Sequence, residues 1–198
     1  FHVPEEALKV FRWAQSRGKQ LEGRWSALLE RYEKAFPEPA DEFKRRKAEL
    51  LPEGWDKGLA AYPAGKSVAT RKASEEILQA LGKNIPELMG GTADLNNSVF
   101  AWLKGLGDFQ RAGDKPAGVQ GAVGGEWGYG GRNIHFGVRE HAMGSIANGL
   151  AAYGGILPFT GTFFVFSDYM RPPIRLAAIS QLKVLFIFSH DSIGVGED

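Results

Sequence analysis

The chain has no cysteine, which excludes both a disulfide framework and a cysteine-ligated metal site. It also carries little net charge, since 24 Lys and Arg residues balance 23 Asp and Glu residues. Such a balance provides no basic footprint for nucleic acid or for an anionic membrane surface. No apolar run is long enough to span a membrane. We therefore expect no nucleic-acid partner and no membrane partner, and the absence of cysteine is compatible with a cytoplasmic location.

Histidine is scarce as well, with four residues in the chain. None has the spacing of a zinc ligand, so no metal site is predicted here. We interpret His135 and His141 as structural, hydrogen-bonded histidines. The acidic, glycine-containing run 191–198 lacks the spacing of a calcium-binding EF-hand loop. It is better interpreted as a loop whose glycines let the backbone approach a ligand.

The first 66 residues are charged and have helical periodicity. A set of apolar side chains recurs at helical spacing and predicts one stripe on a helix that ends at Pro37 and Pro39. The stripe consists of Leu21, Trp25, Leu28, Leu29, Tyr32 and Phe36. A second, weaker helical stretch carries Phe43, Leu50 and Leu51. We interpret residues 1–66 as a helical linker.

From residue 67 onward, predicted strands alternate with predicted helices. The helices are expected at 70–83, 138–153 and 169–181, and the strands at 87–91, 133–137, 156–159 and 182–189. The last of these is expected to be buried on both faces. This order predicts an α/β fold with a mostly parallel sheet and helices on both faces. In such sheets ligands bind beyond the carboxyl ends of the strands. The corresponding loops are 92–98, 137–140, 161–166 and 190–198.

The run 118–131 holds seven glycines in fourteen residues and predicts a loop without regular structure. A dinucleotide-binding fingerprint would follow a strand and open a helix, whereas this run precedes a predicted strand. We therefore reject that interpretation and favour a flap or an interface loop.

Two further features allow more than one interpretation. Glu140 lies in the first turn of a predicted helix, where an acid complements the helix dipole. Directly after a strand, the same carboxylate could instead face a ligand and share a proton with a ring nitrogen. The run Gly161–Phe166 has three Phe in four residues. These rings suit either a core or an aromatic platform for a flat heterocycle.

Five stretches, taken together and in this order, resemble transketolase. They are 69–75 (ATRKASE), 90–95 (GGTADL), 136–144 (FGVREHAMG), 161–163 (GTF) and 190–198 (HDSIGVGED), of which the last is the most specific. The resemblance covers residues 67 to 198 and implies the family's pyrimidine-binding domain. Residues 1–66 resemble the segment that joins this domain to the family's diphosphate-binding domain. The first residue is Phe1, and we expect the chain to be part of a longer polypeptide.

The resemblance implies a homodimeric enzyme of the pentose phosphate pathway that uses thiamin diphosphate, with its active site at the subunit interface. Glu140 looks like the family's activating glutamate, which hydrogen-bonds a pyrimidine nitrogen. Phe166 matches the ring that stacks on the aminopyrimidine, and Phe163 and Tyr169 match the rest of that pocket. Asp94 and Leu95 match residues near the thiazolium ring of the partner subunit's cofactor.

The substrates implied are sugar phosphates, between which a two-carbon ketol unit is transferred. Arg71, Ser98 and His190 match contacts to the phosphate, and Asp198 matches the acid that recognises a substrate hydroxyl. The chain departs from the family at Asn96 and Asn97, where Thr-Pro is frequent. It also lacks the Gly-Asp-Gly motif through which the family binds the diphosphate with Mg²⁺ or Ca²⁺. The chain alone is therefore expected to be inactive.

Three alternatives stay open. Dihydroxyacetone synthase shares the chemistry and differs in sugar preference. Deoxyxylulose-phosphate synthase is disfavoured by the run 190–198. A non-catalytic, transketolase-like dimerisation module is disfavoured because it would have no need of Glu140.

Overall fold

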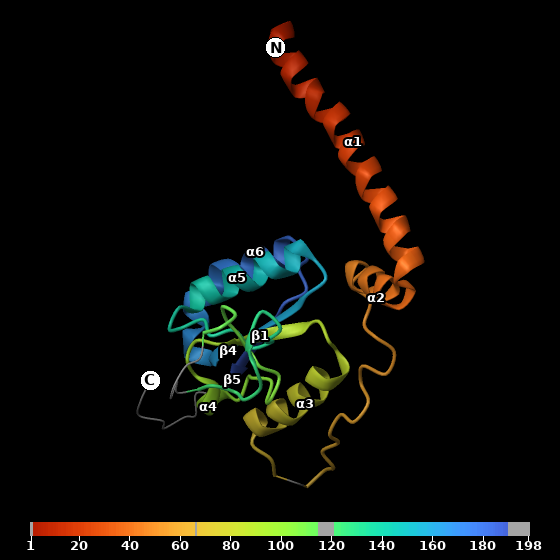
Figure 1. The fold of residues 1–198 in the computed structure, drawn as a ribbon. Coiled ribbons are helices and arrows are strands. Elements are labelled where there is room, and N and C mark those ends of the chain that lie inside the picture. Colours follow the sequence, from red (N-terminus) through yellow and green to blue (C-terminus); the bar gives the residue numbers. More distant parts are fainter. Residues whose placement is uncertain (1, 66, 115–120, 190–198) are drawn as a thin grey trace. The chain divides into compact units, whose positions relative to one another are not determined.

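The structure is a computed structural model that describes residues 2–65, 67–114 and 121–189 (Figure 1). The chain divides into two compact units, Phe1–Arg45 and Arg46–Asp198. Among the residues described, no helix is both long and apolar enough to cross a membrane.

The first unit consists of helix α1 (Glu5–Ala35) and most of helix α2 (Pro37–Lys47). Glu5 and Glu6 lie in the first turn of α1, where acids complement the helix dipole. The helix ends at Ala35, as predicted. Pro37 then opens α2, because a proline at the first helical position loses no hydrogen bond. The second helical stretch is shorter than predicted, since α2 ends at Lys47 and leaves Leu50 and Leu51 outside it.

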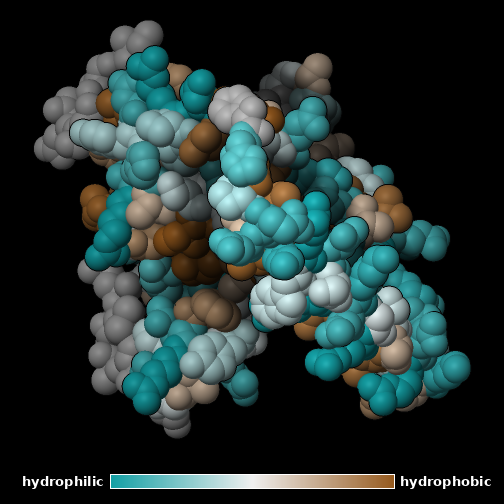
Figure 2. Space-filling model, turned by 90° about the horizontal axis from the view of Figure 1, so that it is seen from above, coloured by the Kyte–Doolittle hydropathy of each residue, from teal (hydrophilic) through white to brown (hydrophobic). Residues whose placement is uncertain are grey.

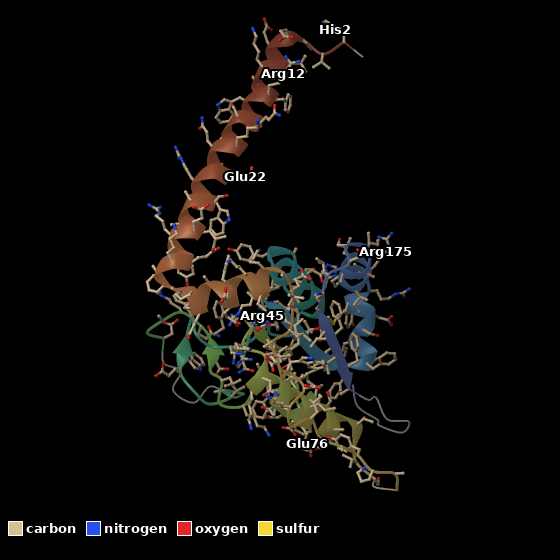
Figure 3. The ribbon with its side chains drawn as sticks, turned by 90° about the vertical axis from the view of Figure 1, so that its right-hand side faces the viewer. His2, Arg12, Glu22, Arg45, Glu76 and Arg175 are labelled. Carbon is tan, nitrogen blue, oxygen red and sulfur yellow. The ribbon has the colours of Figure 1, made fainter. Side chains whose placement is uncertain are left out.

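The predicted apolar stripe forms on α1, but no α1 residue is buried. Trp25 and Leu28 are each about half exposed, at 51% and 50%. Within the unit, Trp25 packs against Phe43 of α2 with the ring centroids 6.1 Å apart. Polar side chains such as Arg12 and Glu22 also project from α1 (Figure 3). The periodicity thus predicted a helix correctly, while the stripe contributes no buried core.

The second unit is built on a parallel sheet of three strands in the order β1 (Leu88–Thr92), β4 (Leu157–Phe163) and β5 (Leu185–Ser189). Gly90 is paired with Phe159, and Phe159 with Leu185. Two short parallel strands, β2 (Asp108–Phe109) and β3 (Trp127–Gly128), lie beside it. Asn133 connects the two groups, because it bridges both Gly90 of β1 and Asp108 of β2.

Helices cover both faces of this sheet. On one face, α3 (Thr70–Asn84) packs through Leu78 into a cluster of seven buried residues that includes Leu88 and Phe159. On the other face, α5 (Glu140–Tyr153) and α6 (Ser167–Ile179) pack through Met143 and Met170. Figure 1 shows the strands between these two layers, and Figure 3 shows Glu76 of α3 and Arg175 of α6 on opposite sides of the strands. The predicted α/β fold is confirmed.

Several predicted boundaries are wrong. The predicted loop 92–98 contains a short helix, α4 (Asn96–Val99). The predicted strand 133–137 is reduced to the bridging residue Asn133. The glycine-rich run was expected to have no regular structure, yet it contains β3. For β3 and Asn133 the conformation depends on pairing with distant residues, which local composition does not report.

Strand β4 continues to Phe163, so the predicted loop 161–166 is a strand end followed by a 3-10 turn (Phe164–Phe166). Helix α6 consequently begins at Ser167 and holds Pro172 and Pro173 in its second turn, whereas the first turn was predicted. Strand β5 starts at Leu185, which is 37% exposed. It was predicted to be buried on both faces, but it lies at the end of the strand order and has one neighbouring strand.

The topology fixes where the helices begin. Each of α3, α5 and α6 precedes a strand of the parallel sheet and covers one face of it, so each runs antiparallel to the strands. The first residues of these helices therefore lie at the edge where β1, β4 and β5 end. Arg71, Glu140 and Ser167 come to the same carboxyl edge for this reason.

The packing of α5 on α6 requires a glycine at position 144. A Cβ atom there would lie 2.8 Å from Pro173 Cγ and 3.1 Å from Met170 Cε. Gly149, on the same helix, has no atom within 4 Å of the corresponding position. We expect Gly149→Ala to gain about 1 kcal/mol from helix propensity. Gly144→Ala should be less stable than Gly149→Ala by about 1–3 kcal/mol, the usual cost of overpacking. Urea unfolding of both variants measures the difference, and equal stabilities would contradict this close packing.

Glu75 of α3 provides a prediction about pH. Burial raises the pKa of its carboxyl, but hydrogen bonds from Lys104, Lys72 and Trp102 outweigh burial and leave the pKa below its ordinary value of 4.5. The stabilisation is therefore complete above pH 4.5 and is lost as the pH falls through the lower, folded-state value. We expect Glu75→Gln to be less stable than wild type at neutral pH and to lose less stability on acidification. Glu53→Gln, at an exposed position, is the control. The measurement is the melting temperature as a function of pH, from neutral pH to below 4.5. If the melting temperatures of wild type and Glu75→Gln fell in parallel, the prediction would be refuted.

Candidate active site at the carboxyl edge of the sheet

Glu140 is the first residue of α5, and its position combines burial with a lack of partners. It is 8% exposed. Arg139 precedes it at the helix N-cap and donates from Nη1 to the carbonyl oxygen of Phe136, 2.7 Å away. Within the described part of the chain, no residue hydrogen-bonds or ion-pairs with the Glu140 carboxylate. A carboxylate on a largely buried residue normally has such a partner, so this group is suited to one supplied by a ligand.

Three aromatic residues lie at the end of β4 and just after it, and the middle ring contacts the other two. Phe163 is the last residue of the strand, and its ring centroid lies 6.3 Å from that of Phe166. Phe166 in turn stacks on Tyr169, with the centroids 6.2 Å apart and the rings inclined by 23°. Tyr169 is 62% exposed. This arrangement is an aromatic platform, which is one of the two interpretations that the sequence left open. Phe163 also packs against the core cluster on the α3 face.

Arg71 and Ser98, far apart in sequence, come together at the same edge. Arg71 Nη1 donates to the carbonyl oxygen of Ser98 at 3.3 Å. The guanidinium also lies over the ring of Phe100, with Cζ 5.4 Å from the centroid, and Lys72 Nζ lies 3.8 Å from that centroid. Phe100 has a positive φ of 56°, which is rare for a bulky residue. Two cations are therefore held at the ring of Phe100, and one of them, Arg71, also contacts Ser98.

The loop after β1 is held in a strained conformation that exposes Asp94. Its φ of 61° is in the left-handed region, and its side chain is exposed. Thr92 Oγ1 accepts from Leu95 N at 2.9 Å and lies 2.7 Å from Asn96 Oδ1, to which it donates. Leu95 packs against the core cluster on the α3 face. Asn96, where the family frequently has another residue, thus helps to fix the loop, and its Nδ2 donates to the carbonyl oxygen of Gly121 at 3.1 Å.

A polar cleft with a volume of about 560 Å³ opens beside this loop. Asp94 and Ser98, both predicted as site residues, line it together. Gln110, Trp127 and His135 form much of the remaining wall. The cleft therefore joins the region after β1 to the glycine-rich run and to the segment that precedes α5.

A buried carboxylate beside this cleft was missed by the sequence reasoning. Asp108 is 0% exposed, and its Oδ1 lies 2.7 Å from Nε2 of His135. Its Oδ2 accepts from the indole of Trp127 at 2.8 Å and from Val123 N at 3.3 Å. His135 was interpreted as a hydrogen-bonded histidine, and the structure confirms the hydrogen bond. The acid lies 27 residues away in sequence, so no local pattern could have identified it.

Two predicted substrate residues, His190 and Asp198, lie outside the described residues. Among the residues that are described, no group of three or more His, Cys, Asp or Glu could hold a metal ion. The described site thus consists of Glu140, the aromatic platform, Arg71 with its neighbours Ser98 and Phe100, and the polar cleft.

The chain matches the family model for the transketolase pyrimidine-binding domain over residues 66–198. It is 46% identical to the transketolase of Halalkalibacterium halodurans over 198 residues and 47% identical to that of Geobacillus stearothermophilus over 199 residues. Each match covers 100% of this chain and 28% of the relative, so the chain spans just over a quarter of their length.

Solved structures give the same result. The chain superimposes on a transketolase from Pichia stipitis, solved in complex with sedoheptulose 7-phosphate, with a TM-score of 0.83 and 40% identity. Transketolase from Leishmania mexicana matches with a TM-score of 0.82 and 40% identity. These matches cover 100% of this chain and 28% and 27% of the two structures. On these grounds the chain belongs to the transketolase family, of which it carries the pyrimidine-binding domain.

Proposed function

We propose that this chain is the part of a transketolase that binds the aminopyrimidine end of thiamin diphosphate and one side of the sugar-phosphate channel. Residues 1–66 would be the linker from a diphosphate-binding domain, and residues 67–198 the pyrimidine-binding domain. The single observation that carries the proposal is Glu140, buried at the start of α5 in a chain of this family and left without a partner by the described residues.

The residues present fit the aminopyrimidine. A flat heterocycle stacks well on an aromatic ring, and Phe166 with Tyr169 offers such a surface at the edge where Glu140 lies. Leu95 and Asp94 would face the thiazolium ring of the cofactor in the partner subunit. When bound, thiamin diphosphate supplies the nucleophilic carbon that takes up and releases the two-carbon unit.

The role of this chain is to hold a proton and to orient the substrate. Glu140 would share its proton with a ring nitrogen of the aminopyrimidine, which is acid–base work by a positioned carboxylate. Arg71 and Ser98, together with His190, would bind the phosphate of the sugar, because a guanidinium matches the geometry of a phosphate dianion. Asp198 would recognise a substrate hydroxyl. The metal ion, Mg²⁺ or Ca²⁺, would be held outside this chain.

A homodimer with the active site at the subunit interface is also part of the proposal. Apolar side chains are exposed on and around α5 and α6, namely Val138, Ile146, Tyr153, Tyr169, Leu176 and Ile179. In Figure 2, which looks down on the α5 and α6 side of Figure 1, hydrophobic atoms lie at the surface among hydrophilic ones. Exposed apolar surface of this kind marks interaction sites. The enzyme would act in the cytoplasm, in the pentose phosphate pathway.

Glu140→Gln tests the catalytic role in the full-length enzyme. The amide has nearly the same size but cannot share a carboxylate proton. We expect turnover at saturating cofactor to fall by a factor of about a hundred to ten thousand, the usual contribution of acid–base catalysis. Affinity for the sugar phosphate should change little. If Glu140 only complemented the helix dipole, the variant would lose about 0.3–1 kcal/mol of stability and keep near-normal turnover, and the proposed role would be wrong.

Arg71→Ala tests the phosphate assignment. A charge-assisted hydrogen bond contributes about 1.5–3 kcal/mol, which corresponds to a loss of about ten- to 150-fold in kcat/KM for ribose 5-phosphate. Unphosphorylated ribose should lose little. Lys83→Ala, which removes an exposed cation from the other end of α3, should affect neither substrate. Equal losses on both acceptors would show that Arg71 supports the fold or the cofactor.

A further inference from the structure

The Asp108–His135 pair lies beside the polar cleft, and the proposed function leaves it unused. The Asp108 carboxylate accepts from three donors, two from side chains and one from the backbone. It is completely buried. A carboxylate is retained in such a place only when its partners satisfy it. Here one of these partners, the imidazole of His135, also reaches a ligand-sized cleft.

The geometry determines which nitrogen of His135 is available. Nε2 lies 2.7 Å from a carboxylate oxygen that can only accept, so Nε2 carries the proton. In the neutral ring Nδ1 is then a hydrogen-bond acceptor. No described residue hydrogen-bonds to Nδ1, and the side chain is 20% exposed. The buried acid thus selects one tautomer, as carboxylates do when they orient a histidine.

The wall of the cleft suits a hydroxylated chain. Asp94 offers acceptors, and Gln110 carries an amide that can donate and accept. Trp127 adds an apolar ring, with its centroid 6.4 Å from that of His135. Asp94 and Ser98 line the same cleft. In the proposed function they stand near the reacting carbonyl and near the phosphate, so the hydroxyl groups of the sugar would lie between them.

We propose that His135 is a specificity-determining residue that accepts, at Nδ1, a hydrogen bond from a hydroxyl of the sugar chain. Asp108 is its positioning residue. This inference rests on the proposed function, since it assigns a further contact within the same substrate channel. The hydroxyl concerned lies between the reacting carbonyl and the phosphate, and an acceptor as short as glycolaldehyde does not reach the contact.

His135→Phe and His135→Gln in the full-length enzyme test this assignment. Loss of a neutral hydrogen bond should lower kcat/KM about two- to twelvefold. The loss should be equal for ribose and ribose 5-phosphate, since both carry the hydroxyl groups, and absent for glycolaldehyde. This pattern differs from that of Arg71→Ala, which separates the two sugars from each other. Glutamine retains an acceptor, so His135→Gln should lose less than His135→Phe, and melting temperatures identify any variant that fails to fold.

Asp108→Asn tests the positioning role through the tautomer. If the asparagine oxygen keeps the bonds from Trp127 and Val123, its amide donates to Nε2 and the ring proton moves to Nδ1. The acceptor at Nδ1 is then lost, and the hydroxyl must turn to accept from Nδ1–H instead. The variant should therefore show the same substrate pattern as His135→Phe with a smaller loss. Nitrogen NMR of the full-length enzyme should show protonated Nε2 at His135 in wild type and protonated Nδ1 in the variant. Asp114→Asn, at an exposed position, should alter neither measurement.

The outcomes separate the two claims. A wild-type enzyme without ketol transfer overturns the proposed function, and with it this inference. An active wild type whose His135 variants lose equally on glycolaldehyde and ribose overturns only the inference, because the ring would then support the fold. A wild-type spectrum with protonated Nδ1 overturns the assignment of the acceptor.

Discussion

The segment that leads into α5 depends on the side chain of Asn133. Its Oδ1 accepts from Leu103 N at 2.7 Å, and its Nδ2 donates to the carbonyl oxygens of Leu103 and Gly107 at 2.8 and 2.9 Å. The residue is 2% exposed, so these bonds form in a dry environment where losing one is costly. These hydrogen bonds hold the segment around Asn133 in place between strands β1 and β2. His135 and Glu140 follow on the same segment, and their positions depend on this attachment.

The backbone of β1 must lie very close to β4 and to the segment around Asn133 for the bridge between Gly90 and Asn133 to form. A Cβ atom at Gly90 would meet the carbonyl oxygen of Phe159, and one at Gly91 would meet that of Ile134. Glycine at both positions allows β1 to fit between β4 on one side and the Asn133 segment on the other. The sheet is thereby continued past β1 by single-residue bridges, and its carboxyl edge extends from the aromatic platform to the polar cleft.

The site is divided by charge. On the α3 side, Arg71, Lys72 and Lys104 are gathered around Phe100, Trp102 and the buried Glu75. Near the starts of α5 and α6, the prominent groups are the aromatic rings and the Glu140 carboxylate. An anionic substrate end and a neutral heterocycle would therefore find different environments at one edge. The strained Asp94 lies in the loop after β1, and such strain persists only where surrounding contacts hold it.

Local sequence was sufficient for features that depend on local physics. Periodicity identified α3, because helical spacing places Ala73, Ile77 and Leu81 on one side of a helix, and Gly154 with Gly155 marked the end of α5. The alternation of strands and helices identified the parallel sheet, and from it the edge at which Arg71, Asp94 and Glu140 would be found. Recognition of the family came from short motifs that keep their order.

Only the tertiary structure decided the features that join distant residues. Three such features are found at the site. Glu140 is buried without a described partner, the Arg71 guanidinium lies over the ring of Phe100, and His135 pairs with Asp108. Each depends on residues that are far apart in sequence. The boundaries that were predicted wrongly also depend on distant residues. Strand β3 forms only by pairing with β2, and Asn133 is bridged to two other strands. Amino-acid sequence specifies local conformational preferences directly, whereas a buried charge or a one-residue bridge is stable only once the whole sheet encloses it.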